Sequence, residues 1–151
     1  MSASDVGRSE LPGPKGRFSR RDRVRKRSDF RRIQEGGERV VSEAFVFLLG
    51  RAPEGSGPRL GITASRRVGN AVTRNRAKRL VREAFRATRS FWPAAADVLV
   101  IVRHALGDRK LADVIREWQA SQSRIARRWA RLTERSEVVA PAGPQLVKKS
   151  C

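Results

Sequence analysis

The sequence predicts a single α+β domain, in which one mixed β-sheet combines with helices in the order α-β-β-α-β-α. Two runs of strand length lie at 44–49 and 59–65, and a third, continuously apolar run lies at 97–103. Helical apolar spacing fills the intervals before, between and after them. The length of 151 residues and the hydrophobic share of 39% suit one compact core.

The chain is expected to divide into one domain and two flanking segments. Residues 1–16 are rich in Gly, Pro and Ser and lack an apolar period, which predicts a flexible N-terminal extension. Residues 17–132 form the predicted domain. Residues 133–151 again lack a period, which predicts a disordered C-terminal tail.

The first helix is predicted over 29–35. Ser28 is its expected N-cap, and Gly36-Gly37 ends it. Phe30 and Ile33 fall on one side of this helix. The strands at 44–49 and 59–65 are expected to pair as an antiparallel hairpin across a loop at 52–58.

The second helix is predicted to begin at Asn70 or Thr73 and to run to about Arg89, before Pro93. At about 100° per residue, small and apolar side chains gather on one side. They are Thr73, Ala77, Leu80, Val81, Ala84, Phe85 and Thr88. The other side carries Asn75, Arg76, Lys78, Arg79, Arg82, Arg86 and Arg89, with Glu83 as the only acid. One face therefore packs on the sheet, and the other is positively charged.

The strand at 97–103 is expected to be central, because it is apolar on both faces. A last helix is predicted from about Asp108, following Gly107, to residue 132. Its apolar positions follow one helical stripe: Leu111, Val114, Ile115, Trp118, Ile125, Trp129 and Leu132. The two tryptophans are expected to anchor the core.

Charge is the strongest global feature. Lys and Arg number 34 against 15 Asp and Glu, which gives a formal net charge of +19. Residues 15–34 hold ten basic residues and two acids, and residues 66–89 hold nine and one. Like charges at i,i+4, such as Lys78 and Arg82, repel one another, so a sequence that keeps them is expected to use them on a polyanion. Contacts to phosphates give salt-dependent affinity without sequence specificity, so shape is expected to select the partner.

Several function classes are excluded or disfavoured. No run approaches the roughly 20 apolar residues that span a bilayer, and the N-terminal segment lacks the apolar stretch of a secretory signal. The only cysteine is Cys151, so no internal disulfide is expected, and a cytoplasmic location is the default expectation. His104 is the only histidine. Clustered carboxylates or histidines that would make a protein-borne nuclease site are absent, and no small-molecule substrate is indicated.

Residues 59–86, with the sequence RLGITASRRVGNAVTRNRAKRLVREAFR, closely resemble the signature of the bacterial ribonuclease P protein component. Arg23, Val24, Asp29 and Phe30 resemble that family's first helix, and residues 97–103 resemble its third strand. The likeness covers roughly 17–132. It implies a left-handed β-α-β crossover around the basic helix, which the general handedness rule would disfavour.

The resemblance implies that the chain is the protein subunit of the ribonucleoprotein that removes the 5′ leader from precursor tRNA. The hydrolase chemistry would belong to the catalytic RNA, which would also hold the Mg²⁺ ions, and no catalytic residue or metal site is expected in the protein. The implied contacts to the catalytic RNA are Arg74, Asn75, Arg76, Lys78, Arg79, Arg82 and Arg86. The implied contacts to the single-stranded leader are Phe30, Arg23, Arg31, Phe45, Phe47, Ser65, Arg66 and Arg67.

Some assignments stay open or depart from the family. An aromatic ring flanked by positive charge is the combination that holds single-stranded RNA, and Phe30 beside Arg31 has it. Phe45 and Phe47 share one strand face, which fits either the core or the leader cleft. Gln34 stands where many relatives have an apolar or aromatic residue, and an Arg pair replaces a commoner Lys pair at 66–67.

Glu83 fits two roles on the basic helix. It could pair with Arg79 or Arg86, or it could help to hold a hydrated magnesium ion near RNA phosphates. Two other functions compete with the ribonuclease P interpretation: a ribosomal or assembly protein, and a DNA-binding regulator. The extended match at 59–86 argues against the first. Against the second, only Asn75 on the basic face offers a neutral group for reading bases.

Overall fold

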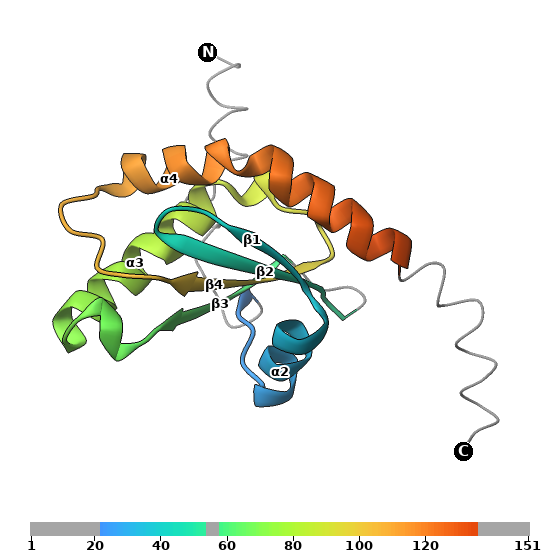
Figure 1. The fold of residues 1–151 in the computed structure, drawn as a ribbon, viewed down its shortest axis with the longest axis horizontal. Coiled ribbons are helices and arrows are strands. Elements are labelled where there is room, and N and C mark those ends of the chain that lie inside the picture. The colour runs from blue at the N-terminus through green and yellow to red at the C-terminus, as the bar shows by residue number, and fades with distance from the viewer. Residues whose placement is uncertain (1–21, 54–57, 136–151) are drawn as a thin grey trace, which may run out of the picture.

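The computed structural model describes residues 22–53 and 58–135 (Figure 1). The helices and strands are α2 (Arg27–Gly36), β1 (Glu38–Val41), β2 (Phe45–Arg51), β3 (Arg59–Ala64), α3 (Ala71–Ala87), β4 (Ala96–Val102) and α4 (Leu111–Ala120). Short 3-10 turns lie at Arg66–Val68 and Arg89–Phe91, and residues 122–135 form a further helix. The predicted α+β class with one mixed sheet is confirmed.

The sheet has four strands in the order β1-β2-β4-β3. β4 pairs antiparallel with β2 (Phe47 opposite Val100) and parallel with β3 (Ile62 opposite Val100). The prediction that β4 is a buried central strand is therefore confirmed. The predicted hairpin between 44–49 and 59–65 is wrong, because β4 lies between those two strands. β2 pairs instead with β1.

β1 is a strand that the sequence analysis did not predict. Its residues, Glu-Arg-Val-Val, alternate between buried and exposed positions, but charged side chains occupy the first two. Four residues with so little apolar content give a weak strand signal. β1 forms because it follows α2 after a single glycine, which turns the chain back along β2. The Cα atom of Gly37 has room for no side chain: a Cβ there would lie 2.4 Å from the Leu49 carbonyl oxygen.

The two faces of the sheet are covered by different helices, as Figure 1 shows with α2 on one side and α3 and α4 on the other. On the α2 side, Ile33 packs with Val46, Leu48 and Leu99 in a small core. On the other side lies the larger core, which contains Phe45, Phe47, Val81, Phe85, Trp92 and Trp118. The strands are therefore apolar on both faces, which explains the continuous apolar run of β4.

The helix ends agree with the sequence only in part. Of the two residues that the sequence offered, Asn70 and Thr73, Asn70 caps α3, with its Oδ1 accepting from the Thr73 backbone N–H at 2.9 Å. The N-cap of α2 is Lys26 and not Ser28, so this prediction is wrong by two residues. The predicted last helix begins at Leu111 and is interrupted at Ser121. Its second segment continues through 133–135, where the tail was expected to begin. Residues 1–21 and 136–151 lie outside the described ranges.

Within the described residues, no helix combines the length and the apolar character that crossing a bilayer requires.

Candidate nucleic-acid interface

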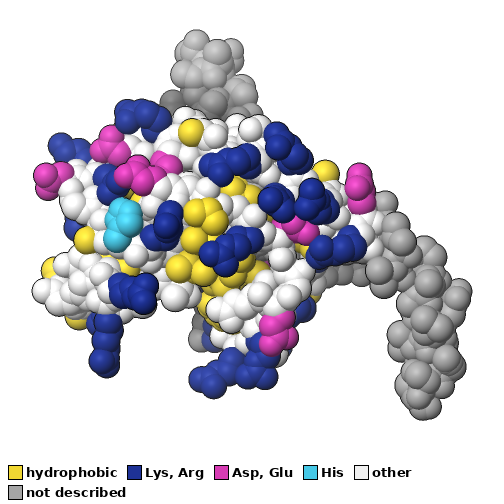
Figure 2. All heavy atoms as spheres, in the orientation of Figure 1, with side chains coloured by type: hydrophobic (Ala, Val, Ile, Leu, Met, Phe, Trp, Pro, Cys, Tyr) yellow, Lys and Arg dark blue, Asp and Glu magenta, His cyan; other side chains and the backbone are white. Residues whose placement is uncertain are grey.

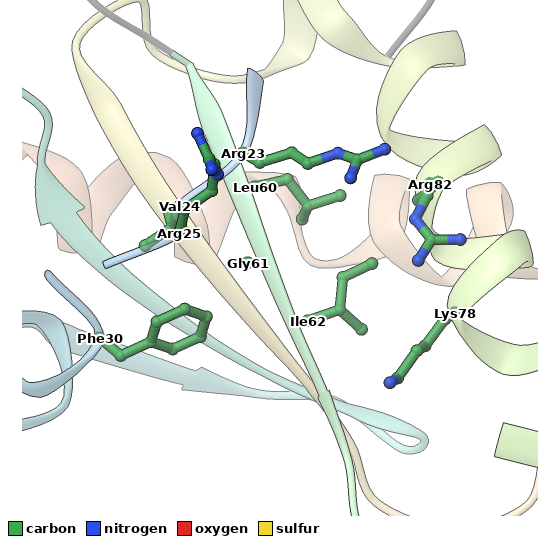
Figure 3. Close-up of a pocket in the computed structure, with 9 residues that line it drawn as sticks. All are labelled: Arg23, Val24, Arg25, Phe30, Leu60, Gly61, Ile62, Lys78 and Arg82. Carbon is green, nitrogen blue, oxygen red and sulfur yellow. The ribbon is translucent and has the colours of Figure 1, made fainter. Parts of the chain in front are cut away.

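A cleft follows the free edge of β3, between the α2 layer and the α3 layer. It consists of two adjoining pockets of ≈ 160 and ≈ 480 Å³ that share Arg25, Phe30, Ile62 and Lys78. In Figure 3, Phe30 lies on one side of β3, and Lys78 and Arg82 come from α3 on the other side. The other lining residues are Arg23, Val24, Arg27, Leu60, Gly61, Thr63 and Ala64. We call these residues together the β3 cleft.

Arg23 and Val24, which precede α2, close the β3 cleft at the end near Leu60. The Val24 backbone N–H donates to the Leu60 carbonyl oxygen at 3.0 Å, and Arg23 forms a parallel bridge with Leu60. Val24 itself is buried in the smaller core. This pairing occupies only the start of the β3 edge, so the rest of the strand stays open toward the cleft.

Phe30 lies directly over Gly61. A Cβ atom at position 61 would lie 3.0 Å from the Phe30 Cζ and 3.1 Å from the Leu99 Cδ1, which is closer than side-chain contacts normally are. The glycine therefore lets the ring approach the strand. Phe30 stays only half-buried, so its ring combines a packed side with a side that faces the cleft.

A network of charges attaches α2 to the sheet and so fixes Phe30. The fully buried Asp97 carboxylate on β4 accepts from Arg59 at 2.7 Å through both Nε and Nη2, and from Arg32 of α2 at 3.0 Å. Asp29 of α2 also pairs with Arg32 and Arg59. Burial pushes the pKa of Asp29 upward, but its hydrogen bond to Arg32 and the nearby arginine charges outweigh this and hold it below its usual value. The hydrogen bond with Asp97 raises the pKa of Arg59.

The basic side of α3 divides into an outward part and a part that lines the cleft. Asn75 and Arg79 are exposed, whereas Lys78 and Arg82 are half-buried in the cleft. Arg76 donates to the Arg109 carbonyl oxygen at 2.7 Å. Arg74 and Arg86 are half-exposed. All seven predicted residues of this helix thus reach the surface or the cleft.

Arg82 is held in a strongly positive environment. Burial lowers the pKa of its guanidinium, and the neighbouring charges of Arg23 and Arg79 lower it further. Because arginine stays protonated at any physiological pH, the consequence is electrostatic crowding and not loss of charge. An anion in the cleft would relieve that crowding.

Two predicted leader contacts are in the wrong place. Phe45 and Phe47 are 0% exposed and lie on the opposite face of the sheet from Phe30. Their rings pack edge-on against Trp118, at centroid distances of 5.9 and 5.6 Å. These two residues belong to the core, because β2 directs its odd-numbered side chains toward α3 and α4. They cannot stack on a bound base without unfolding.

The other predicted leader residues lie at or beside the β3 cleft. Phe30 and Arg23 line it. Arg31 is exposed on α2 but does not line either pocket. Ser65, Arg66 and Arg67 are exposed immediately after β3, where the Ser65 hydroxyl accepts from the Arg67 backbone N–H at 3.3 Å. They directly follow Ala64, which lines the cleft.

The sequence analysis missed Arg25, Arg27, Ile62 and Thr63 as cleft residues. Arg25 and Arg27 belong to the basic run at 15–34, but a helix expected to start after Ser28 gives their side chains no location. Ile62 and Thr63 follow a strand pattern that gives no sign of a cleft. Their exposure follows from β3 being an edge strand, which a hairpin assignment conceals.

Among residues 22–53 and 58–135, neither Glu83 nor His104 has a partner that suggests catalysis. In the described ranges, Glu83 forms no ion pair with Arg79 or Arg86, so the pairing considered from the sequence is not formed. His104 is exposed, and its Nδ1 lies 2.9 Å from the Ala105 carbonyl oxygen. No three His, Cys, Asp or Glu side chains among the described residues gather into a possible metal site.

Comparison with known proteins agrees with this geometry. The family model for ribonuclease P matches residues 18–126. A ribonuclease P protein component of Syntrophus aciditrophicus is 38% identical over 96 residues, which cover 64% of this chain and 80% of the relative. One from Citrifermentans bemidjiense is 31% identical over 113 residues, covering 75% and 96%.

Solved structures show the same likeness in three dimensions. The RNase P protein of Staphylococcus aureus is 34% identical, with a TM-score of 0.61, covering 71% of this chain and 96% of that one. The RNase P protein of Thermotoga maritima is 34% identical, with a TM-score of 0.60, covering 68% and 96%. The family match spans most of the described residues, including α2, the β3 cleft and α3. The chain therefore belongs to the ribonuclease P family.

Proposed function

We propose that this chain is the RNA-binding protein subunit of ribonuclease P and assists a catalytic RNA in removing the 5′ leader from precursor tRNA in the cytoplasm. The catalytic RNA and the precursor tRNA are its partners in this proposal. The observation that carries it is the β3 cleft, where the Phe30 ring and the Lys78 and Arg82 side chains line one continuous space. A stacking platform beside positive charge is the arrangement that holds a single strand.

The leader would lie along the open edge of β3. One base would stack on Phe30, and the neighbouring phosphates would meet Arg82, Lys78 and the arginines of the segment before α2. Burial, and after it the charges of Arg23 and Arg79, lower the pKa of Arg82. This supports the proposal, because a phosphate there neutralises mutually repelling cations. None of these contacts reads a base edge, so binding would tolerate many leader sequences.

The catalytic RNA would pack on the outward part of α3. Asn75 and Arg79 are exposed there, and Arg74 and Arg86 flank them. Since Lys78 and Arg82 are one helical turn apart and line the cleft, the leader and the catalytic RNA would meet along the same helix. The protein would thereby hold the leader close to the RNA that cleaves it.

The hydrolytic chemistry is assigned to the RNA partner and not to the protein. Magnesium would activate the attacking water there. The described residues include no group of three metal ligands, so no side chain of this chain is assigned to that ion. The contribution of the protein is binding and charge neutralisation.

The proposal is tested by multiple-turnover cleavage of precursor tRNA by the cognate RNA at low magnesium, with and without the full-length protein. We expect the protein to raise cleavage and substrate affinity, because it adds phosphate and base contacts to the leader. A precursor with a single-nucleotide leader serves as the matched substrate. It reaches fewer cleft residues and should gain much less affinity.

Two outcomes would contradict the proposal. If the protein changes neither cleavage nor affinity, the chain does not act as this subunit. If both precursors gain equally, the protein acts on the catalytic RNA alone, and the β3 cleft does not bind the leader.

A further inference from the structure

A second basic groove lies at the opposite edge of the sheet from the β3 cleft. It has a volume of ≈ 540 Å³ and is lined by Arg39, Val40 and Val41 of β1 and by Arg124, Arg127 and Arg128 of the last helix. We call it the β1 groove. Since β1 and β3 are the two outer strands, three strand spacings of about 4.8 Å, or roughly 14 Å, separate the two edges. In Figure 2, basic side chains gather over the last helix and the neighbouring sheet, with apolar surface between them.

The charges of the β1 groove are only partly neutralised by the protein. Arg128 and Arg135 both pair with Glu38, at 3.4 and 2.8 Å, and Glu38 is only 7% exposed. Arg39 and Arg127, by contrast, are exposed and pair with no acid anywhere in the described ranges.

The sequence of the last helix adds to this charge. Residues 122–135 carry five arginines and one acid, Glu134. The arginines at 124, 127, 128 and 131 are neighbours at i,i+3 and i,i+4, where like charges cost a few tenths of a kcal/mol per pair. This is the pattern that marks α3, repeated on a helix at the other end of the sheet.

One groove arginine is already positioned. Arg124 donates to the Val41 carbonyl oxygen at 2.7 Å and to the Ser121 hydroxyl at 3.1 Å. Its guanidinium thus caps the β1 edge and is held beside Arg127, with no acidic partner in the part of the chain that the structure describes. A preordered guanidinium loses less entropy when it binds a phosphate than a freely rotating one.

A simpler account is that charge on β1 only prevents edge-to-edge aggregation. An arginine on the edge strand is a known protection of that kind, and Arg39 alone would supply it. That account does not require the unpaired Arg127 or the row of arginines along the helix. The edge carbonyl of Val41 is also already occupied by Arg124.

We propose that the β1 groove is a second RNA-binding site, which binds the phosphodiester backbone of an RNA segment that does not pass through the β3 cleft. Four arginines line the groove and suit phosphates, and Val41, at 40% exposed, is the only large apolar side chain there that is so exposed. A membrane would need a broad apolar face. A protein interface would have a core depleted of charge, and a second copy of this chain would be repelled by its own net charge.

The choice of RNA as the anion rests on the function proposed above, whereas the presence of an anion-binding groove does not. The groove is independent of the leader, because no residue of the β1 groove lines the β3 cleft. Bound RNA would therefore contact the protein on two edges of the sheet.

The test is the salt dependence of binding of a fluorescent oligouridylate to the full-length protein. Arg39→Gln with Arg127→Gln removes two charges without removing any hydrogen bond among the described residues. We expect the slope of log affinity against log salt to fall by about 1.4, at roughly 0.7 per lost single-strand contact. Arg116→Gln is the control, because Arg116 is an exposed arginine of α4 that pairs with Asp113 away from both sites. Its slope should not change.

Independence of the two sites is tested by adding Arg79→Gln and Arg82→Gln to the groove variant. The decreases in slope should add, since distant sites contribute independently.

An unchanged slope for the groove double variant overturns the proposal. The proposal is also overturned if the groove double variant loses binding to polyglutamate or to anionic vesicles but keeps its binding to oligouridylate. The cleavage assay separates this failure from that of the proposed function, because it measures leader processing whether or not the β1 groove binds RNA.

Discussion

The Phe30 side chain both packs on the sheet and lines the proposed RNA-binding cleft. One side of its ring rests over Gly61, and the other side faces the cleft. Leucine fills similar space over the glycine but has no π-face. The two roles of the ring can therefore be separated by substitution.

Phe30→Leu should weaken binding of precursor tRNA by about 1–3 kcal/mol, the contribution of one stacked base, while leaving binding of mature tRNA unchanged. Equilibrium binding to the protein–RNA complex measures both affinities. Phe91→Leu is the matched control, because Phe91 is also half-buried but packs on Trp92 outside the cleft. If both variants lose the same affinity, the loss reflects general destabilisation.

Arg82 carries the electrostatic part of the same site. Arg82→Ala should reduce the salt slope of RNA binding by about 0.7–0.9, equivalent to one phosphate contact. The measurement is affinity for the cognate catalytic RNA and for precursor tRNA at several salt concentrations. The matched variant Arg116→Ala should leave the slope unchanged. An unaltered slope in Arg82→Ala would show that this guanidinium does not meet a phosphate.

At the scale of elements, α2 is held on the sheet by charge as well as by Ile33. The carboxylate of Asp97 on β4 bridges Arg59 on β3 and Arg32 on α2. The buried carboxylate of Asp97 therefore helps to hold α2, the helix that carries Phe30, in place. The position of Phe30 therefore depends on contacts made far from its ring.

Asp97→Asn should lower the free energy of unfolding by about 3 kcal/mol, because it removes the buried carboxylate charge that pairs with Arg59 and Arg32 and leaves Arg59 only its longer contact with Asp29. Urea denaturation measures this change. Asp108→Asn removes an exposed acid without a partner among the described residues and should change stability very little. Equal effects from the two variants would mean that the Asp97 network does not hold the fold together.

The contacts of Asp29 with Arg32 and Arg59, which help to attach α2 to the sheet, should depend on pH. Its folded pKa lies below the ordinary value of 3.8, so the stabilisation it gives is present above that value and is lost as the pH falls through the lower folded pKa. Wild-type stability should therefore fall on acidification through this range, and Asp29→Asn should show a shallower fall. Urea denaturation at a series of pH values provides the comparison. Parallel profiles would rule out this role for Asp29.

At the scale of the whole molecule, a net charge of +19 acts against compactness. Basic residues line grooves at both edges of the sheet, so repulsion is concentrated at the places where RNA is proposed to bind. Salt screens such charges, with a Debye length of about 10 Å at 0.1 M. The free protein is therefore expected to gain stability from ionic strength.

The melting temperature of the free protein should rise as NaCl is increased from low to moderate concentration, because screening relieves self-repulsion. Differential scanning calorimetry measures this, and stoichiometric RNA should produce a larger rise at low salt by binding only the folded state. A melting temperature that is flat or falls with salt would show that the charges are balanced locally and do not strain the fold.

The sequence alone identified the elements whose signals are local. The two-sided helix α3 and the apolar strand at β4 are determined by spacing within a few residues, and the structure confirms them. The cap of α3 was narrowed to Asn70 or Thr73, and the structure has Asn70 there. The signature at 59–86 identified the family for the same reason. The four residues of β1 were missed because a short strand with two charged side chains has little apolar pattern.

The tertiary structure decided which elements are neighbours. Alternation along β2 shows that Phe45 and Phe47 share a face, but not which layer covers that face. Inserting β4 between β2 and β3 put both rings in the core and left β3 as an edge. Phe30, Lys78 and Arg82, which lie far apart in the sequence, line one cleft. Strand order depends on long-range packing between layers, which residue periodicity does not encode.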